Sequence, residues 1–348
     1  MFDEPAIRFL PLGGRRLAYE VRGEGPPLVA PAWWVSHLEL DWQSAHVRRF
    51  WEGVAREHTL IRYDRLGVGM SDHTLGAADL TLDGEVAVLG ALLDELGLER
   101  VSLIGGSSGG CTAVGFAASF PERVDRLVLY GSYPDGAALT APGVAEAIMA
   151  AVRAHWGLGS RLLSDVFLGN ADAAEHDRFA RLQRESTTAD TAAALLGMVY
   201  RLDVRDHLAR VRQPTTVIHR RDDRAVPCRF GREVAAAIPG AKFVPLQGSS
   251  HFPWHGDVDP VIRACRQALA VWQPSSADGT TADAVPLSGR EREILACVAQ
   301  GLGDREIAEQ LGLSPHTVHR HVANIRGKLG SPSRTAAVAE AARRGLLE

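Results

Sequence analysis

The hydrophobic positions in most of the chain alternate between short apolar runs and longer stretches of helical periodicity. Runs of β-branched and aliphatic residues predict strands at residues 15–21, 28–32, 59–63, 101–104, 127–130, 215–219 and 242–246. Apolar residues spaced three or four positions apart predict helices at residues 82–96, 108–120, 229–238 and 257–272. This alternation indicates an α/β fold with a mostly parallel sheet and helices on both faces. We expect the first two strands to form a hairpin, which makes that edge of the sheet antiparallel.

Two segments interrupt this pattern. Residues 134–210 are Ala-rich and helical by pattern, without a candidate strand, which predicts a helical lid inserted between two sheet strands. Residues 273–286 are small, polar and turn-forming, which predicts a flexible linker. We therefore expect an α/β domain at residues 1–272 and a smaller domain at residues 287–348.

The smaller domain carries the start and stop signals of four helices. Ser288 and Glu291 form a capping box at the start of the first helix. The other caps are expected at Asp304, Ser314 and Ser333, and the stops at Gly312 and Gly345. A short turn at residues 312–314 joins the second and third helices, so we expect a small all-α domain that contains a helix-turn-helix.

The third helix of this domain has two different faces. One face is an apolar stripe made by Val318, Val322, Ile325 and Leu329. The other face presents Thr317, Arg320, His321, Asn324 and Lys328. Residues 314–334 contain no acidic residue, whereas the whole chain has a formal net charge of −4. A local basic stripe on a mildly acidic chain indicates a module that binds a polyanion.

Composition limits the class of protein. Hydrophobic residues make up 46% and charged residues 23% of the 348 residues, as in ordinary globular proteins. No apolar run is long enough for a transmembrane helix and the N-terminus lacks a secretory pattern, so we expect no membrane association. The four cysteines are scattered without metal-ligand spacing and no Gly-rich phosphate loop follows the first strands. We expect a cytoplasmic location, no metal and no cofactor.

Candidate chemistry begins with a serine between a strand and a helix. Residues 105–109 read Gly-Gly-Ser-Ser-Gly, a G-x-S-x-G pattern after an apolar strand. Such a turn is sharp and holds Ser107 Oγ clear of the backbone at the carboxyl edge of the sheet. The backbone N–H of Ser108 begins the next helix and can face a developing oxyanion.

A nucleophilic serine needs a base, and the base needs an orienting acid. The loop after the sixth expected strand carries Asp222 and Asp223. The loop after the seventh carries His251 and His255. Both loops leave the same edge of the sheet as Ser107, so the three kinds of group can converge there.

These features resemble the α/β-hydrolase superfamily. The matching segments, within about residues 10–272, are residues 63–72, 105–109, 222–227 and 250–253. The resemblance implies that Ser107 is the nucleophile, Asp223 the acid and His251 the base. Asp223 is preferred to Asp222 because it fits the family's D-x-x-V-P spacing. His251 is preferred to His255 because the family's histidine lies nearer the strand.

The loop after the second expected strand would supply another oxyanion donor. In the family this loop usually contains a glycine, whereas residues 31–37 read Pro-Ala-Trp-Trp-Val-Ser-His. The resemblance implies that the N–H of Trp33 or Trp34 joins that of Ser108. The chain also departs from the family at Arg220, where glycine is common.

Aromatic side chains near these loops are candidates for the wall of a ligand pocket, with packing in the core as the alternative for each. The candidates are Trp34, Phe252, Trp156 and Trp254. Together with a helical lid, they favour a ligand with an apolar acyl or ring group.

The smaller domain strongly resembles the LuxR-type helix-turn-helix domain over residues 286–347, without a gap. In such a motif the second helix lies in the major groove of DNA. The resemblance implies DNA contacts, mostly to phosphates, from Thr317, Arg320, His321, Lys328 and Arg334. Asn324 shares this face, and His319 stands where the family often has lysine. A solvated face is the alternative for each of these side chains.

Regulators of this type usually bind DNA as dimers on paired half-sites. The last helix has small residues in register at Ala336, Ala337, Val338 and Ala341. This helix is a candidate dimer surface, and packing against its own domain is the alternative.

Three functions fit this combination of domains. In the first, the hydrolase-fold domain binds a small acyl, ester or lactone ligand and changes how a homodimer presents itself to double-stranded DNA. In the second, the protein is a serine esterase or lactonase with an appended DNA-binding domain. In the third, the hydrolase-fold domain is an inert scaffold. The fusion favours the first, and the complete Ser–Asp–His set argues against the third. The first two combine in a regulator that senses and slowly hydrolyses its ligand.

Overall fold

The computed structural model describes residues 6–270, 287–329, 331, 334–343 and 346. The chain divides into two compact units, residues 1–271 and 272–348. The expected linker at residues 273–286 lies outside the described residues. None of the helices in the described part of the chain is both long and apolar enough to cross a membrane.

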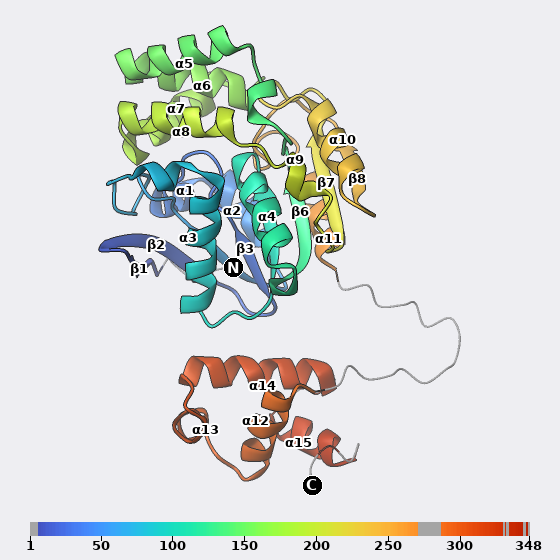
Figure 1. Ribbon diagram of the computed structural model, residues 1–348. Coiled ribbons are helices and arrows are strands. Elements are labelled where there is room, and N and C mark those ends of the chain that lie inside the picture. The colour runs from blue at the N-terminus through green and yellow to red at the C-terminus, as the bar shows by residue number, and fades with distance from the viewer. Residues whose placement is uncertain (1–5, 271–286, 330, 332–333, 344–345, 347–348) are drawn as a thin grey trace. The chain divides into compact units, whose positions relative to one another are not determined.

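The first unit is built on one eight-stranded sheet (Figure 1). Its strands are β1 (Arg8–Leu12), β2 (Arg15–Arg22), β3 (Pro27–Ala30), β4 (Thr59–Tyr63), β5 (Val101–Gly106), β6 (Val124–Tyr130), β7 (Thr215–Arg220) and β8 (Lys242–Leu246). Their spatial order is β1-β2-β4-β3-β5-β6-β7-β8. β2 is antiparallel to β1 and β4, and every other neighbouring pair is parallel. The expected α/β fold with a mostly parallel sheet is confirmed.

The expected hairpin between the first two predicted strands is wrong, although that edge of the sheet is antiparallel. β2 forms its hairpin with β1 across the turn at Gly13 and Gly14, which have φ values of 57° and 81°. β3 pairs in parallel with β4 and β5 instead. Leu28 and Val29 of β3 are fully buried. Burial on both faces suits a central parallel strand rather than an edge hairpin.

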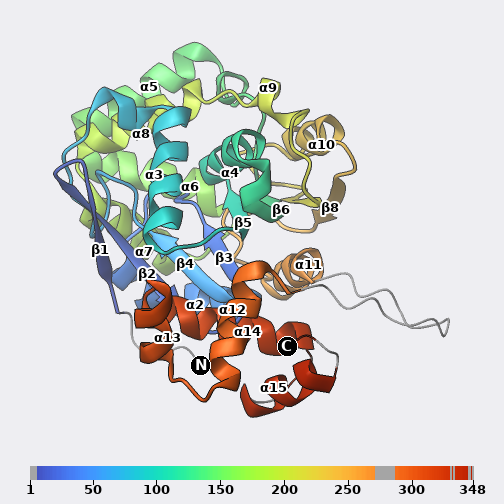
Figure 2. The same ribbon diagram turned by 60° about the horizontal axis from the view of Figure 1, so that its bottom comes forward.

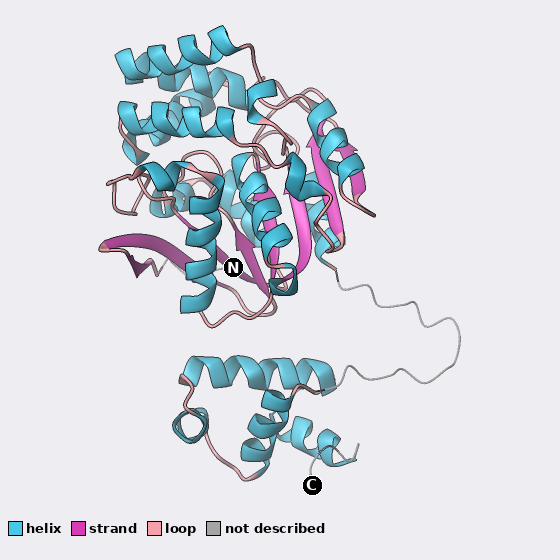
Figure 3. Ribbon diagram, in the orientation of Figure 1, coloured by secondary structure: helices cyan, strands magenta, loops and turns pink. Residues whose placement is uncertain are grey.

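Helices cover both faces of the sheet (Figures 2 and 3). They are α1 (Leu38–Gln43), α2 (Ala45–Val54), α3 (Leu82–Glu95), α4 (Ser108–Ser119), α9 (Arg205–Leu208), α10 (Cys228–Ala237) and α11 (Asp259–Leu269). Short 3₁₀ turns lie at Ala77–Leu80, Pro121–Arg123 and Gly136–Ala138. α3 packs beside α4 on one face, and α2 packs beside α11 on the other.

Four further helices lie between β6 and β7 along the chain, where the sequence predicts a lid. They are α5 (Pro142–Ala154), α6 (Trp156–Leu168), α7 (Ala173–Ser186) and α8 (Ala189–Arg201). The carbonyl of Ser186 accepts from the N–H of Gly69, and the carbonyl of Phe167 accepts from the N–H of His251. Because Gly69 follows β4 and His251 follows β8, these helices cover the carboxyl ends of the strands (Figure 1).

The second unit contains α12 (Gly289–Ala299), α13 (Asp304–Leu311), α14 (Pro315–Leu329) and α15 (Arg334–Arg343). The capping box of Ser288 and Glu291 is present, and Gly312 ends α13 with φ at 65°. Gly303, rather than Asp304, is the capping residue of α13, because the Glu306 carboxylate accepts from the Gly303 N–H. The expected cap at Ser333 and stop at Gly345 lie outside the described residues.

Candidate active site and nucleic-acid interface

Ser107 lies in the turn between β5 and α4, as the sequence predicts. Among the described residues it is the one non-glycine residue with a positive φ, at 50°. A Cβ on Gly106 would lie 2.5 Å from the Trp33 ring, and one on Gly109 would lie 2.7 Å from the Pro31 carbonyl oxygen. The turn therefore requires glycine on both sides of the serine. Backbone strain of this kind typically costs about 1–3 kcal/mol and is common at functional sites.

His251 and Asp223 form a buried hydrogen-bonded pair. Nδ1 of His251 donates to Oδ2 of Asp223 at 2.8 Å. The other carboxylate oxygen, Oδ1, accepts from the backbone N–H groups of Ala225 and Val226, each at 3.0 Å. Because Nδ1 of His251 carries the proton, Nε2 keeps the lone pair that a general base needs.

A second imidazole also supports this carboxylate. Nε2 of His219 donates to the carbonyl of Val226 at 2.8 Å and lies 3.6 Å from Oδ2 of Asp223. Burial alone would raise the pKa of Asp223, but His251 and His219 together lower that pKa well below its usual value. Asp223 therefore remains ionised and holds the imidazole of His251 in one orientation.

The ends of β5 and β6 bring Ser107 close to His251. The N–H of Ser107 donates to the carbonyl of Tyr130 at 2.9 Å. A Cβ on the next residue, Gly131, would lie 3.2 Å from Cε1 of His251. No hydrogen bond joins the Ser107 hydroxyl to His251 within the described part of the chain. The hydrogen bond between His251 and Asp223 is therefore formed, and the one between Ser107 and His251 is not. Catalytic hydrogen bonds are often long or absent in structures without substrate.

The two alternatives considered from the sequence lie elsewhere. Asp222 is exposed, and its backbone N–H donates to the carbonyl of Gly248. His255 faces Glu175 on the lid, with 3.4 Å between Nδ1 and Oε1 but no hydrogen bond at Nδ1. Neither side chain is part of the His251 pair.

The loop at residues 31–34 lies against the start of α4. The Ser108 hydroxyl donates to the Trp33 carbonyl at 2.6 Å. The Trp33 ring stacks on Tyr130 with 6.2 Å between centroids and on Trp254 with 5.2 Å. The structure thus brings Ser108 together with Trp33 and its neighbour Trp34.

A buried arginine that the sequence analysis did not select holds this loop. Arg65 is 2% exposed and donates to the carbonyls of Ala32, at 3.1 Å, and Trp34, at 3.3 Å. Its guanidinium also forms a two-point ion pair with Glu85, at 2.9 and 3.1 Å. The signal that could have found it was a pair of charged residues, Asp64 and Arg65, directly after the buried strand β4.

Arg220 holds the histidine loop in a similar way. Its guanidinium is 2% exposed and donates to the carbonyls of Ser250, Pro253 and Asp257 at 3.4, 3.4 and 3.1 Å. Arg220 stands where glycine is common in the family. Its side chain therefore places a buried cation beneath the loop that carries His251.

The lid closes directly over the histidine. The backbone N–H of His251 donates to the Phe167 carbonyl at 2.7 Å, and the two rings lie 5.8 Å apart at 29°. The Trp34 indole donates to Oε1 of Gln183 on α7 at 3.1 Å. These contacts tie the lid to the loops on either side of Ser107, which is itself half-buried.

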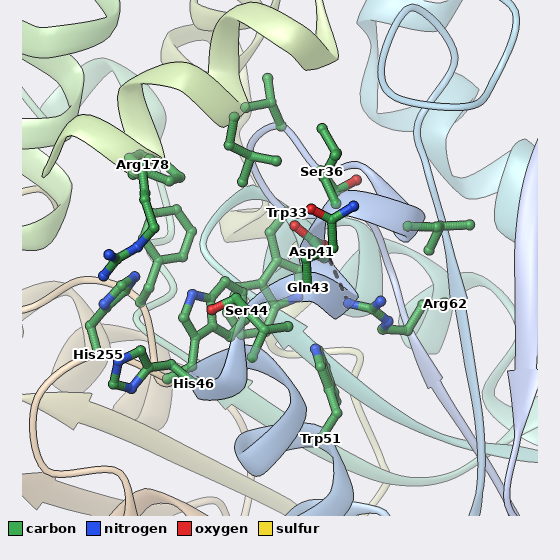
Figure 4. Close-up of a pocket in the computed structure, with 18 of the residues that line it drawn as sticks. Trp33, Ser36, Asp41, Gln43, Ser44, His46, Trp51, Arg62, Arg178 and His255 are labelled. Atoms are coloured by element: carbon green, nitrogen blue, oxygen red, sulfur yellow. Dashed lines mark hydrogen bonds and ion pairs between the residues drawn. The ribbon is translucent and has the colours of Figure 1, made fainter. Parts of the chain in front are cut away.

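A cavity of about 520 Å³ lies between α1, α2 and α7, and Phe252, the residue after His251, is part of its wall (Figure 4). Of the predicted pocket residues, Phe252 and Trp254 line it. Trp34 and Trp156 do not line it, since the Trp34 indole bonds to the lid and the Trp156 indole donates to the Thr187 carbonyl at 3.0 Å.

The predicted DNA-binding face of α14 is present in the second unit. Val318, Val322, Ile325 and Leu329 are buried in the core of this unit. Asn324 is exposed, and Thr317, Arg320 and His321 are half-buried. The helix therefore presents an apolar face to its own domain and a polar face to solvent.

Several predicted DNA contacts are engaged with acids of their own domain. Nζ of Lys328 lies 2.6 Å from the Glu291 carboxylate. Arg334 and His319 both pair with Asp304, at 2.5 and 3.2 Å. A DNA phosphate would have to compete with these carboxylates.

The expectation that α15 offers its small residues as a dimer surface is only partly compatible with the structure. Ala337 and Ala341 are 2% and 0% exposed and belong to the core of their own unit. These two residues are therefore not available to a partner, whereas Ala336 and Val338 are half-buried.

Comparisons with known proteins agree with both units. The family profile described as alpha/beta hydrolase fold matches residues 42–255, and that of the bacterial regulatory proteins of the luxR family matches residues 285–341. An uncharacterized protein of Mycobacterium bovis is 28% identical over 305 residues, which cover 79% of this chain and 84% of that protein. A 2-hydroxy-6-oxononadienedioate/2-hydroxy-6-oxononatrienedioate hydrolase of Cupriavidus pinatubonensis is 33% identical over 199 residues, covering 54% of this chain and 68% of that protein. The crystal structure of an enol-lactonase from Burkholderia xenovorans superposes with a TM-score of 0.63 at 23% identity, covering 75% of this chain and 99% of that chain.

Proposed function

Because the chain belongs to the α/β hydrolase fold family and carries a LuxR-family domain, we propose that it is a DNA-binding transcriptional regulator that senses a small ester or lactone. In this proposal the hydrolase-fold unit also hydrolyses its ligand slowly. The observation that carries the proposal is the buried Asp223–His251 pair beside the strained Ser107 turn, in the same chain as a helix-turn-helix. An inert scaffold would not need such a pair.

The proposed chemistry is acyl transfer through Ser107. Nε2 of His251 takes the proton of the Ser107 hydroxyl as Oγ attacks the carbonyl carbon, and Asp223 stabilises the charged imidazole. The N–H of Ser108 and one from Trp33 or Trp34 hold the oxyanion. His251 then gives its proton to the leaving alkoxide. A water activated by His251 releases the acid and restores the serine.

Slow turnover fits the contacts of the lid. Phe167 lies over His251, and the Trp33 ring packs against Gly106. We infer that both rings restrict how an acyl group approaches the half-buried Ser107. Losing one oxyanion donor costs about 10²–10³ in rate, so an imperfect loop gives a slow enzyme. A slow enzyme stays acylated long enough to report its ligand.

The DNA-binding role uses the polar face of α14. We infer that a homodimer binds double-stranded DNA in the cytoplasm, with Arg320, His321 and Asn324 facing the groove. Lys328, Arg334 and His319 then exchange their carboxylate partners for phosphates.

A serine esterase or lactonase with a regulatory DNA-binding unit is the second candidate. The His251–Asp223 pair and the hydrolase name of the Cupriavidus relative favour it. The two candidates differ in whether ester binding changes DNA affinity.

One pair of assays separates these candidates. Turnover of p-nitrophenyl butyrate and binding to DNA fragments selected by the full chain are measured on wild type and on Ser107→Ala. We expect the variant to lose turnover, keep basal DNA binding and lose the ester-dependent change in DNA affinity. Asp222→Asn, which alters an exposed neighbour, should match wild type. Unchanged turnover and unchanged ester response in Ser107→Ala would refute the proposal.

A further inference from the structure

The loop that carries His251 is folded around a buried guanidinium. Arg220 is the last residue of β7, and its guanidinium donates to the carbonyls of Ser250, Pro253 and Asp257 at 3.4, 3.4 and 3.1 Å. His251 lies between the first two of these acceptors in the chain. A single side chain therefore holds the backbone on both sides of the histidine.

Two glycines allow the loop to close on Arg220. Gly248 and Gly256 have φ values of 115° and 70°, in the left-handed region that favours glycine. A Cβ on Gly248 would lie 3.2 Å from Cδ of Arg220, and one on Gly256 would lie 3.4 Å from Nη1. Both ends of the loop therefore pass close to the arginine side chain, and residues 248–257 enclose it.

The guanidinium is held by carbonyl groups rather than by an ion pair. Arg220 is 2% exposed, and no carboxylate of the described residues lies within ion-pair distance of it. Its Nε is also buried and has no partner in the described part of the chain, so its polar contacts are the three carbonyls. Burying a cation without an anionic partner is unfavourable unless hydrogen bonds compensate for the lost water. The cation and the loop therefore depend on each other, because removal of the arginine leaves three carbonyls of the histidine loop without their donor.

The position of this loop decides how the imidazole meets the serine. His251 bonds to Asp223 through Nδ1, but its hydrogen bond to Ser107 is not formed. Misplacement of a reacting group by about 1 Å can cost about 10²-fold in rate. A side chain that holds the backbone on both sides of the histidine therefore controls the reactivity of the serine.

We propose that Arg220 is a positioning residue for His251, because its planar set of charged donors is the template on which residues 248–257 fold. Arg220 acts through the loop and takes no part in the bond changes at Ser107. This catalytic consequence rests on the proposed function, whereas the folding of the loop around Arg220 does not.

The rate at which a fluorophosphonate labels Ser107 in the full chain tests this role. In Arg220→Ala we expect the maximal labelling rate to fall by about 10²-fold, with little change in the probe concentration that gives half of that rate. Millimolar methylguanidinium matches the group that the substitution removes, and should raise the rate of Arg220→Ala by about tenfold. Methylammonium carries the charge without the planar donors and should restore much less. Arg221→Ala, which removes a neighbouring exposed arginine, should react as wild type does.

Arg220→Lys is a second variant, for the case that Arg220→Ala does not fold. It keeps the charge and most of the aliphatic stem, but its ammonium lacks the planar fork that spans three separate carbonyls. We expect its labelling rate to fall by about tenfold.

Hydrogen exchange of residues 248–257 measures the loop without any chemistry at Ser107. We expect faster exchange in both Arg220 variants than in wild type, and renewed protection when methylguanidinium is added to Arg220→Ala. If the wild-type serine does not react with the probe, this result would leave Arg220 as the template of the loop while the hydrolytic proposal fails.

Four results would overturn the proposal. They are a wild-type labelling rate in a folded Arg220 variant, wild-type exchange of the loop in both variants, equal restoration by methylammonium and methylguanidinium, and a slowed Arg220→Ala that methylguanidinium does not restore.

Discussion

Replacing Arg65 by methionine tests how the loop at residues 31–34 is held. The substitution removes the two-point ion pair and leaves the carboxylate of Glu85, which is 5% exposed, without its partner. Breaking a buried pair on one side costs about 3–5 kcal/mol. The carbonyls of Ala32 and Trp34 also lose hydrogen bonds worth about 1 kcal/mol each. We therefore expect Arg65→Met to lower the free energy of unfolding by about 4 kcal/mol or more.

Urea denaturation followed by tryptophan fluorescence measures this loss mainly in the first unit. Six of the seven tryptophans lie in that unit, and the seventh, Trp272, precedes the helix-turn-helix domain. The matched control is Arg65→Met with Glu85→Leu, which removes both charges. This double variant should recover most of the stability, because an apolar pair of similar volume replaces the buried ion pair. It should not recover ester turnover, because the carbonyls of the loop remain unheld.

The reasoning fails under either of two results. One is a loss in Arg65→Met below about 1 kcal/mol, which is less than a buried unpaired carboxylate costs. The other is a double variant no more stable than the single one.

The remaining expectations concern the acid and the DNA face. Asp223→Asn should lower ester turnover by about 10⁴, since the imidazole loses its orienting carboxylate, whereas Asp222→Asn should have little effect in the same assay. The lowered pKa of Asp223 means that its contribution to stability is complete above its unfolded pKa of about 3.9 and is lost as pH falls through and below that value. The difference in unfolding free energy between wild type and Asp223→Asn should therefore narrow between pH 6 and pH 3, and a constant difference would contradict the assignment. If about six phosphates are neutralised per dimer, log K for DNA should fall with log salt at a slope of about −5, and a flat response would exclude the DNA role. Deleting residues 274–348 should abolish DNA binding and leave turnover intact.

Local signals in the sequence were sufficient for the parts of the site that depend on neighbouring residues. The glycines around Ser107 are required by close approach of the 31–34 loop, and they were visible as a G-x-S-x-G pattern. The capping box of Ser288 and Glu291 in the second unit could be predicted too, because its two residues are only three positions apart. The order of strands pointed to the two loops at one edge of the sheet, and the resemblance to the α/β hydrolases then selected Asp223 and His251 within those loops.

Pairing between distant segments could not be predicted in this way. The first two expected strands, at residues 15–21 and 28–32, were predicted to form a hairpin, yet β2 pairs with β1 and β4. β1 was not predicted: Pro11 interrupts its apolar run at residues 9–12, and a proline within such a run argues against a strand. The strand order places β3 inside the sheet, where both of its faces are buried. The short apolar run of β3 does not by itself tell a central strand from an edge strand.

The cavity was also beyond the sequence analysis. Its lining joins residues of α1, α2 and α7 to the loop after β8, and no motif connects these segments. Trp34 and Trp156 were chosen as aromatic candidates, but their indoles bond within the fold.

Intact mass after exposure to a fluorophosphonate probe tests most directly whether Ser107 is an activated nucleophile in this DNA-binding protein. We expect a one-to-one adduct on the wild-type chain and none on Ser107→Ala. Asp223→Asn should react much more slowly than wild type, since its imidazole is no longer held. The absence of an adduct on folded wild-type protein, or an adduct that persists in Ser107→Ala, would contradict a working Ser–His–Asp site.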